Sequence, residues 1–382
     1  MLDKRPRPVT RVAGRGPLGL FAALLAVFAL AACSSGSFPS ISPTVAASTP
    51  QTTPAETSQA AASAAPSSAA PELPDPRTIT GPSHVSVAQT IKPVAKRPTQ
   101  SFPVSFTDSA GQAHEITDAS RVLLLDISGT YSQIAVGLGL EHVLVGRTAS
   151  DLSPELAQLP LVTVNGHELS GEAILALAPT LVVTDTTLGP PEVVEQLRGS
   201  GIPVVTLDSG RRMDTVERDI VAISSLLGVP AEGRKLADAA LADIEAARQE
   251  IAQYAPSQPM RTIVLYIRGT SGVFFIFGKG YGTAALLEAV GAEDSASTAG
   301  IEDVKPANAE ALAALDPEMI LVMSGGLTST GGLEGLLARP GVAQTTAGTR
   351  QRIIDVEDGL LLSFGPNTGN VIRALAKAMY QP

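Results

Sequence analysis

Short apolar runs alternate with amphipathic helical patterns along most of the chain beyond residue 100. Runs such as 121–126 and 181–185 have the length and composition of strands buried on both faces, and segments with a 3.6-residue apolar period separate them. A second series of the same kind starts near residue 261 and ends in a helix from Thr368. Because buried strands separated by helices are typical of parallel sheets, we predict an α/β protein with two lobes, each with a mainly parallel sheet flanked by helices.

The segment between the two series has no strand pattern. Helical periodicity runs through it and is interrupted only at Gly228–Pro230. We therefore predict an N-terminal lobe at 101–212, a helical connector at 213–255 and a C-terminal lobe at 256–382. A long helical connector, in place of several crossing strands, implies little hinge bending.

One phrase occurs twice, once in each predicted lobe. The stretch "NGHELSGEAILALAPTLVVTD" at 165–185 returns in part as "NAEALAALDPEMILVM" at 308–323. In both copies a capping residue precedes a Glu, an apolar face, a Pro and a buried strand, which together indicate one helix–strand unit. The repetition favours two similar lobes.

The N-terminal part of the chain differs from the rest. Five basic residues precede an apolar run at 18–32, which is shorter than the roughly 20 residues of a membrane-spanning helix and ends in "LAAC". Residues 1–33 thus resemble a bacterial lipoprotein signal peptide in which Cys33 becomes the lipidated first residue; the alternative is a chance Cys in a signal peptide. Cys33 is the only cysteine, so no disulfide can form within the chain. Residues 34–100, rich in Ser, Thr, Ala and Pro at their start, are predicted to be a disordered tether.

Charge narrows the possible partners. The first 32 residues hold five of the 27 basic and one of the 37 acidic residues, which leaves 22 basic and 36 acidic residues and a net charge of −14. An acidic chain of this kind is not expected to bind nucleic acid. We expect the charges to serve mainly solubility.

Three residues have side chains suited to binding iron. His167 follows a predicted strand at its carboxyl end, where open α/β sheets bind ligands, and a neutral imidazole can ligate iron. Tyr266 and Arg268 lie two apart on a predicted strand and so share one face. A guanidinium beside a phenol favours the phenolate, which suits Fe(III). The alternatives are an exposed loop His and a core Tyr with an Arg at the strand's end.

These features together resemble the substrate-binding proteins of ABC importers for haem, cobalamin and siderophores. The resemblance spans 102–382 and includes the opening "FTDSAGQAHEITDASRVLLLD". Within that class, "NGHELSGEAILALAPTLVVTD" and "RTIVLYIRG" resemble the haemin-binding lipoproteins of the HmuT type. The family fold, two α/β lobes joined by a helical backbone, agrees with the pattern prediction.

The resemblance also implies roles for individual residues. His167 and Tyr266 match the family's axial iron ligands, and Arg268 matches the residue that supports the Tyr. Glu172 and Glu310, one in each copy of the repeat, match the residues that dock on Arg residues of the permease. The implied function is capture of ferric haem b and its delivery to an ABC permease and ATPase for iron acquisition. The protein would be a monomer, lipid-anchored to the outer face of the cytoplasmic membrane.

No competing catalytic or metal motif is present. The sequence has no HExxH, CxxC or P-loop, and no supported Ser-His-Asp set, so an enzyme is not expected. His84 is placed in the tether, His114 in a hairpin and His142 in solvent. The Gly-rich stretch 277–285 is expected to shape the cleft wall, with contacts from its Lys279 or Tyr281 left open. Tyr131 is expected to pack in the core; the alternative is that it reaches the cleft.

Two other functions remain open at this point. The same scaffold can carry a ferric siderophore or a corrinoid, although the chain has no Trp and few aromatic residues. A surface haem scavenger that does not take part in transport is a further alternative.

Overall fold

The computed structural model of the protein describes residues 74–210, 212–270 and 272–381. The predicted signal peptide, with Cys33, and the first part of the predicted tether lie outside these residues. Within the described residues, no helix combines the length and the apolar character needed to cross a bilayer.

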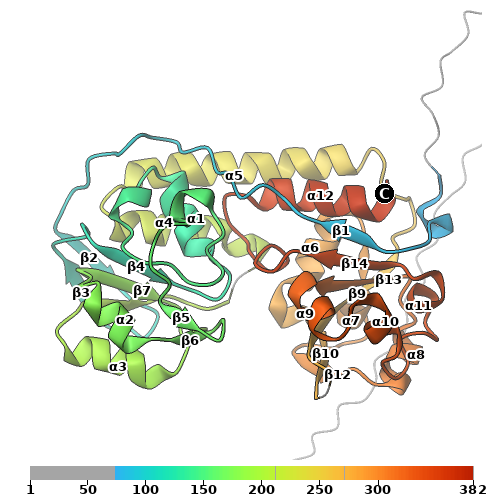
Figure 1. Cartoon of the computed structure of the whole chain (residues 1–382). Helices are drawn as coiled ribbons and strands as arrows, with labels where there is room; N and C mark the ends of the chain where they lie inside the picture. Colours follow the sequence, from blue (N-terminus) through green and yellow to red (C-terminus); the bar gives the residue numbers. More distant parts are fainter. Residues whose placement is uncertain (1–73, 211, 271, 382) are drawn as a thin grey trace, which may run out of the picture. The chain divides into compact units, whose positions relative to one another are not determined.

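The N-terminal lobe is built on a parallel three-stranded sheet of order β4-β7-β8. Alternate residues of the central strands point to opposite faces: Leu124 packs in the cluster that contains α1 and α4, and Leu123 packs with α2 and α3. Helices therefore cover both faces of the sheet (Figure 1). The elements of this lobe are β2 (Val104–Thr107), β3 (Ala113–Ile116), β4 (Val122–Leu125), α1 (Thr130–Gly137), β5 (Thr163–Val164), β6 (Glu168–Leu169), α2 (Gly171–Ala176), β7 (Leu181–Thr184), α3 (Pro191–Gly199) and β8 (Val204–Thr206).

The C-terminal lobe has a larger sheet of order β1-β14-β13-β9-β10-β12, in which β1 is Ser83–Val85, and β11 pairs with the start of β9. Strands β1, β14, β13 and β9 are parallel, whereas β10 and β12 add an antiparallel edge. Helices α6 and α12 cover one face, and α8 and α10 the other. The elements are β9 (Arg261–Arg268), β10 (Val273–Phe277), α6 (Thr283–Ala289), β11 (Glu293–Asp294), α7 (Ser295–Thr298), β12 (Val304–Pro306), α8 (Ala309–Leu315), β13 (Met319–Met323), α9 (Ser324–Ser329), α10 (Gly332–Leu337), α11 (Thr346–Arg350), β14 (Ile353–Val356) and α12 (Thr368–Tyr380).

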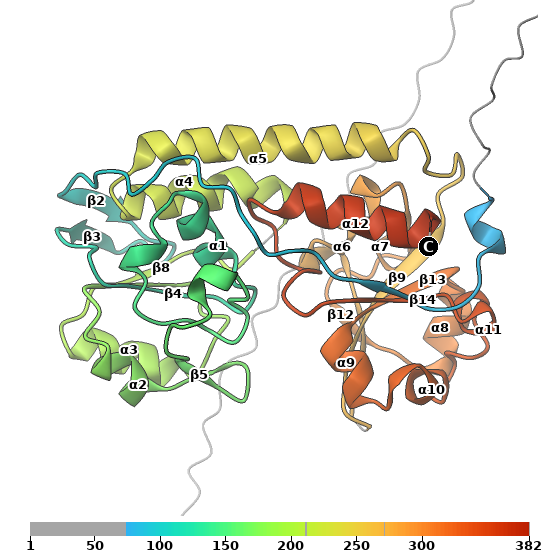
Figure 2. The same cartoon turned by 45° about the horizontal axis from the view of Figure 1, so that its top comes forward.

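The connector consists of α4 (Val216–Leu226) and the long α5 (Pro230–Ile251). Gly228 separates them with a positive φ of 70°, and a Cβ there would come within 2.7 Å of a backbone oxygen of Ser101. Helix α12 lies alongside α5 (Figure 2). The prediction of two α/β lobes joined by a helical connector is confirmed.

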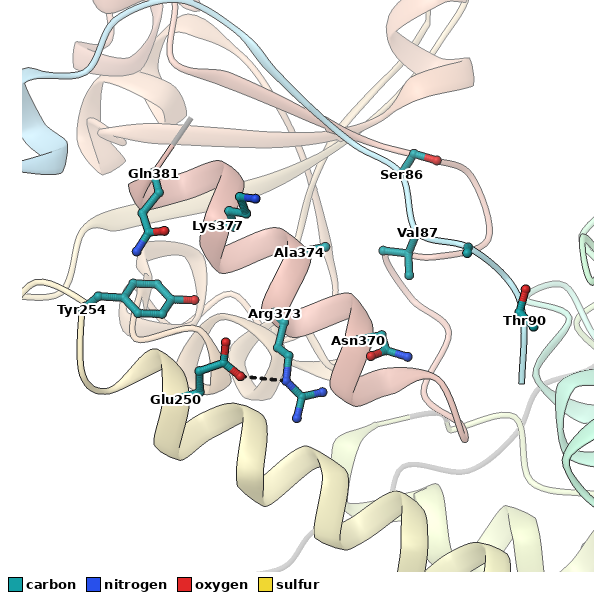
Figure 3. Close-up of a pocket in the computed structure, with 11 residues that line it drawn as sticks. Ser86, Val87, Thr90, Glu250, Tyr254, Asn370, Arg373, Ala374, Lys377 and Gln381 are labelled. Atoms are coloured by element: carbon teal, nitrogen blue, oxygen red, sulfur yellow. Dashed lines mark hydrogen bonds and ion pairs between the residues drawn. The ribbon is translucent and has the colours of Figure 1, made fainter. Parts of the chain in front are cut away.

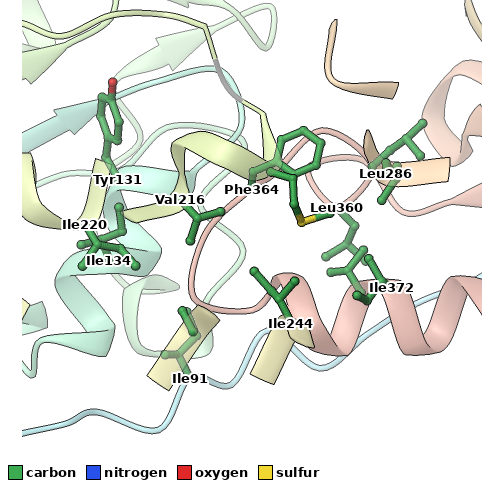
Figure 4. Packing of buried hydrophobic residues seen from close by; sticks show 14 of the residues in the cluster. Ile91, Tyr131, Ile134, Val216, Ile220, Ile244, Leu286, Leu360, Phe364 and Ile372 are labelled. Atoms are coloured by element: carbon green, nitrogen blue, oxygen red, sulfur yellow. The ribbon is translucent and has the colours of Figure 1, made fainter. Parts of the chain in front are cut away.

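One apolar cluster extends through both lobes and the connector. Figure 4 shows Ile134 of α1 and Ile220 of α4, together with Ile244 of α5 and Ile372 of α12, as members of this cluster. Polar contacts add to it: the hydroxyl of Ser363, in the segment after β14, accepts a hydrogen bond from Gln133 at 3.2 Å and lies 3.3 Å from the hydroxyl of Thr130. The two lobes are thus packed against each other as well as joined by the chain.

The prediction of a tether that continues to residue 100 is wrong for its last part. Strand β1 (Ser83–Val85) pairs in parallel with β14, and Val85 is only 2% exposed. The guanidinium of the buried Arg352 donates to the Ser83 hydroxyl at 2.7 Å, and His84, expected in the tether, lies 2.6 Å from the Asp355 carboxylate. This strand has few apolar residues, so the sequence pattern did not indicate it. Its stability comes from a partner strand that is about 270 residues away in the sequence.

We predict that removal of β1 destabilises the fold. A chain that starts at residue 87 loses the burial of Val85 and leaves Arg352 without the acceptors on residues 81 and 83. Relative to a chain that starts at residue 74, its free energy of unfolding in urea should fall by about 3 kcal/mol. Equal unfolding midpoints for the two chains would contradict the role of β1.

A buried carboxyl group in the N-terminal lobe makes stability depend on pH. Asp151 is 4% exposed and accepts the backbone N–H of Thr148 at 2.6 Å. Burial, and the nearby buried carboxylate of Asp126, raise the pKa of Asp151 from 3.8 to about 7. Between these two values the folded state keeps a proton that the unfolded state has released, so the free energy of unfolding falls as pH rises.

We expect Asp151→Asn to remove this dependence. The amide keeps an acceptor for Thr148 but has no proton to lose, so the variant should gain stability relative to the wild type by up to about 1.4 kcal/mol per pH unit between pH 4 and 7. Urea unfolding of both proteins at several pH values measures the difference. A difference that does not change with pH would show that Asp151 is ionised in the folded state.

Candidate functional site

Several strands of the C-terminal sheet end at the same edge. β9 ends at Arg268, β13 at Met323 and β14 at Val356, and these strands are parallel. In open α/β sheets the carboxyl edge of the strands is the usual place for ligands. The last residues of β9, the start of α9 directly after β13 and the loop that follows β14 therefore form the part of this lobe suited to binding.

Tyr266 is held between a cation and an aromatic ring. Its ring stacks on Phe277 with centroids 5.5 Å apart, and the guanidinium carbon of Arg268 lies 5.3 Å from its centroid. Arg268 is two residues further along the same strand, whereas Phe277 ends the antiparallel neighbour in the opposite direction. These two neighbours, one on each side, restrict movement of the half-buried phenol ring along the strand.

The stack continues to Tyr281, whose part in the site the sequence left open. The rings of Phe277 and Tyr281 lie 4.5 Å apart with an interplanar angle of 16°, and Tyr281 is 39% exposed. Three aromatic rings therefore lead from the strand to the surface. Such a surface favours a flat, apolar ligand.

Arg268 has a partner that the sequence did not indicate. Its Nη2 donates to a carboxylate oxygen of Asp358 at 3.0 Å and lies 3.8 Å from the sulfur of Met323. The other carboxylate oxygen of Asp358 accepts the backbone N–H of Gly325 at 2.7 Å. Asp358 lies in a loop 90 residues after Arg268, and no local pattern marks it as part of this site.

His167 lies in the turn of the small β5–β6 hairpin. The turn starts with Asn165 and Gly166, both with positive φ (50° and 85°), the backbone conformation that an Asn-Gly pair favours. The carbonyl of His167 accepts the N–H of Gly189 at 3.2 Å, which attaches the turn to the loop after β7. The side chain is exposed and, among the described residues, its ring has no hydrogen-bond partner. The imidazole is thus available to a ligand.

Exposed apolar side chains accompany this histidine on the N-terminal lobe. Val164 directly precedes the turn and is 49% exposed, and Ile127 and Leu152 are 45% and 41% exposed. The backbone N–H of Ile127 donates to Thr187, in the same loop that holds the turn. Exposed apolar side chains on these segments would suit contact with an apolar ligand.

The structure brings some predicted site residues together and leaves others apart. Tyr266 and Arg268 are in contact, as the strand periodicity predicts. Throughout the described residues, no hydrogen bond or ring contact joins His167 to either of them. Tyr131 is completely buried in the core, as expected.

Glu172 and Glu310 occupy equivalent places in the two lobes. Ser170 caps α2 through the N–H of Ala173 at 3.3 Å, and Asn308 caps α8 through the N–H of Ala311 at 2.9 Å. Each Glu lies in the first turn of its helix and is exposed, with no ion pair among the described residues. Each helix leads into a parallel strand, so the predicted helix–strand repeat is confirmed.

A separate groove lies elsewhere on the molecule. It has a volume of about 650 Å³ and is lined by α5, α12 and the segment after β1, where Glu250 and Arg373 form an ion pair at 3.0 Å (Figure 3). None of the predicted site residues lines it. No group of His, Cys, Asp and Glu suited to a metal ion occurs among the residues that the structure describes.

Comparison with known proteins adds the following. The family model of the periplasmic binding proteins matches residues 127–359. A crystal structure of the heme binding protein HmuT is similar, with 45% identity and a TM-score of 0.78 over 81% of this chain and 100% of that chain. The periplasmic heme-binding protein RhuT from Roseiflexus sp. RS-1 is 35% identical, with a TM-score of 0.63 over 69% of this chain and 98% of that one.

Two relatives are more distant in sequence. The ABC transporter substrate-binding lipoprotein YvrC of Bacillus subtilis is 23% identical over 75% of this chain and 88% of its own length. The vitamin B12-binding protein of Yersinia pestis is 29% identical over 41% of this chain and 53% of its own length. Solved variants of HmuT replace one His, one Tyr or one Arg by Ala.

Proposed function

Because the chain belongs to the family of periplasmic binding proteins, we propose that it binds ferric haem outside the cytoplasm and delivers it to an ABC importer. Members of this family bind and deliver a cargo, and the protein is accordingly not an enzyme. The cargo is taken up for its iron.

The observation that most favours haem as the cargo is the restrained phenol side chain of Tyr266. Arg268 lies two positions after it, as the replaced Arg of HmuT lies two positions after the replaced Tyr, and the separation of His167 from Tyr266 equals that of the replaced His and Tyr. At 45% identity this common spacing supports the same roles for the three residues here.

The chemistry of the two lobes suits the two faces of one haem. Tyr266 is the ligand from the C-terminal lobe, since the Arg268 guanidinium beside its ring favours the phenolate that Fe(III) prefers. His167 is the ligand from the N-terminal lobe, since its imidazole lies on an exposed turn and has no hydrogen-bond partner among the described residues. Tyr281 and the exposed Ile127, Leu152 and Val164 supply apolar contacts for the porphyrin.

The remaining parts of the proposal concern location and partners. Cys33 carries the lipid anchor, and the Ser/Thr/Ala/Pro-rich segment after it keeps the folded part, a monomer, at the outer face of the cytoplasmic membrane. A single acyl chain binds a membrane only marginally, so the anchor carries more than one. Glu172 and Glu310 dock on the permease, one from each lobe.

A corrinoid is the second candidate cargo, favoured by the vitamin B12-binding relative. That match covers about half of the relative's length, whereas the heme-binding matches cover nearly whole chains. Titration of the purified protein with ferric haem or with cobalamin, followed by absorbance, separates the two. If only cobalamin gives a saturable spectral change, the cargo is a corrinoid and not haem.

The alternative of a surface haem scavenger is tested by deletion of the cognate permease. If the protein is such a scavenger, the deletion leaves haem uptake unchanged.

We predict that Tyr266→Phe removes the phenolate ligand without disturbing the ring stack. The ferric haem complex should lose its phenolate-to-iron absorption, and the haem affinity should fall tenfold or more, about 1.4 kcal/mol. His167→Ala should retain the phenolate absorption but release haem faster. Absorbance spectra and transfer of haem to apomyoglobin measure both effects.

Matched variants control for general effects of the substitutions. Tyr254→Phe removes a hydroxyl at the separate groove, and His142→Ala removes another exposed His. Both should behave as the wild type. If Tyr266→Phe and His167→Ala also leave the spectrum and the release rate unchanged, the assignment of the iron ligands is wrong.

A further prediction separates delivery from binding. Glu172→Lys with Glu310→Lys places positive charges opposite the cationic sockets expected on a permease, where loss of a charge pair costs about 2–5 kcal/mol. Haem affinity and spectrum should not change, whereas stimulation of the transporter ATPase in reconstituted membranes should fall strongly. The corresponding Ala pair should have a weaker effect.

The control variant is Glu217→Lys with Glu245→Lys, two exposed carboxylates on the connector helices. It changes the net charge equally and should leave ATPase stimulation intact. Docking through Glu172 and Glu310 is refuted if both double variants stimulate the ATPase as the wild type does.

A further inference from the structure

Asp358 joins three parts of the C-terminal lobe at the end of β9. It follows β14, its Oδ2 accepts from Arg268 at 3.0 Å, and its Oδ1 accepts the N–H of Gly325 at the start of α9 at 2.7 Å. The carboxylate is thus attached to the backbone on one side and to the guanidinium on the other.

The backbone around this contact leaves a slot for the guanidinium. A Cβ on Gly326 would come within 2.8 Å of Nη1 of Arg268, and a Cβ on Gly325 within 2.7 Å of Oδ2 of Asp358. Both approaches are closer than real Cβ contacts permit. At Gly326 the Cβ would come closer still, to 2.6 Å, to the backbone oxygen of Ile267, so the backbone of β9 requires this glycine; at Gly325 the lack of a Cβ leaves room for the Asp358 carboxylate.

Without a fixed partner, Arg268 would have little to hold it. Its side chain is 37% exposed, and besides the Tyr266 ring its other side-chain contacts among the described residues are the carbonyl of Ile267 at 3.4 Å and the sulfur of Met323 at 3.8 Å. An arginine side chain has many rotamers, and weak contacts do not select one of them. The ion pair with Asp358 is the contact that selects the rotamer lying over Tyr266.

Other charged groups near this edge have partners of their own. Asp355 accepts from the hydroxyl of Ser324 and pairs with His84, and Glu357 accepts the hydroxyl of Ser86. Helix α9, which packs against the end of β9, brings no charged residue. Among the described carboxylates, Asp358 alone forms an ion pair with Arg268.

We propose that Asp358 is a positioning residue that holds the Arg268 guanidinium over the Tyr266 ring and thereby sets the strength of the iron–phenolate bond. This inference rests on the proposed haem function. Among the described residues no hydrogen bond joins Asp358 to Tyr266, so Asp358 acts through Arg268. A carboxylate that only neutralised Arg268 would have the opposite effect, since its removal would leave a stronger positive charge beside the phenol and favour the phenolate.

The sign of one measurement distinguishes the two roles. The pH midpoint at which the phenolate-to-iron absorption of the ferric haem complex appears should rise in Arg268→Ala by about one pH unit. Asp358→Ala should raise the midpoint in the same direction by at least half as much. Asp358→Asn, which keeps a similar shape and one acceptor oxygen, should lie between Asp358→Ala and the wild type. The double variant should equal Arg268→Ala, because Asp358 has no effect once Arg268 is absent.

Glu357→Gln is the matched control, since it removes the adjacent negative charge without touching Arg268. Its midpoint should equal that of the wild type. A midpoint in Asp358→Ala that is unchanged or lower overturns the proposal, and so does an equal shift in Glu357→Gln. Should Asp358→Ala fail to fold, as judged by its thermal unfolding, Asp358→Asn decides by the same criteria.

Failure of the inference and failure of the proposed function give different results. If the wild type shows no phenolate absorption, or Tyr266→Phe does not remove it, the iron ligation is wrong and Asp358 has nothing to position. If Tyr266→Phe and Arg268→Ala behave as expected and Asp358→Ala does not, only the role of Asp358 is wrong.

Discussion

One continuous apolar core is the feature on which the rest of the structure depends. It passes from one face of the N-terminal sheet, through α4 and α5, to the face of the C-terminal sheet that α12 covers. Because interiors are close-packed, neighbouring lobes that share such a core cannot rotate freely without losing contacts. Residues on the separate sheets are thus carried by a common framework.

Within that framework, the parallel pairing of the strands determines at which edge of the sheet a binding site can form. Strands that run in one direction end at one edge, so Tyr266, Arg268 and the loop with Asp358 meet although they come from distant parts of the chain. The antiparallel strand β10 then brings Phe277, and beyond it Tyr281, beside the same tyrosine. A phenol with a cation on one side and aromatic rings on the other is well suited to an electron-poor metal in a flat apolar ligand.

The N-terminal lobe contributes in a different manner. Its histidine is held by the backbone of a short hairpin, while the imidazole itself has no partner among the described residues. With its backbone fixed and no hydrogen-bond partner for its ring among the described residues, this histidine could take up a ligand without losing a hydrogen bond. Exposure of the apolar side chains near this hairpin to water costs free energy. Burial of these side chains against a ligand would remove that cost.

The sequence by itself determined the features that depend on local periodicity. Buried strands, amphipathic helices, the repeated helix–strand unit with its capping residues and the shared face of Tyr266 and Arg268 all follow from patterns within about 20 residues. Only the tertiary structure decided which distant segments pair. Strand β1 is ordered by β14, Asp358 is brought to Arg268 across 90 residues, and Tyr281 joins a stack that begins on another strand. These contacts have no local signature, since a carboxylate, a ring or a short polar strand acquires its partner only when the chain has folded around a common core.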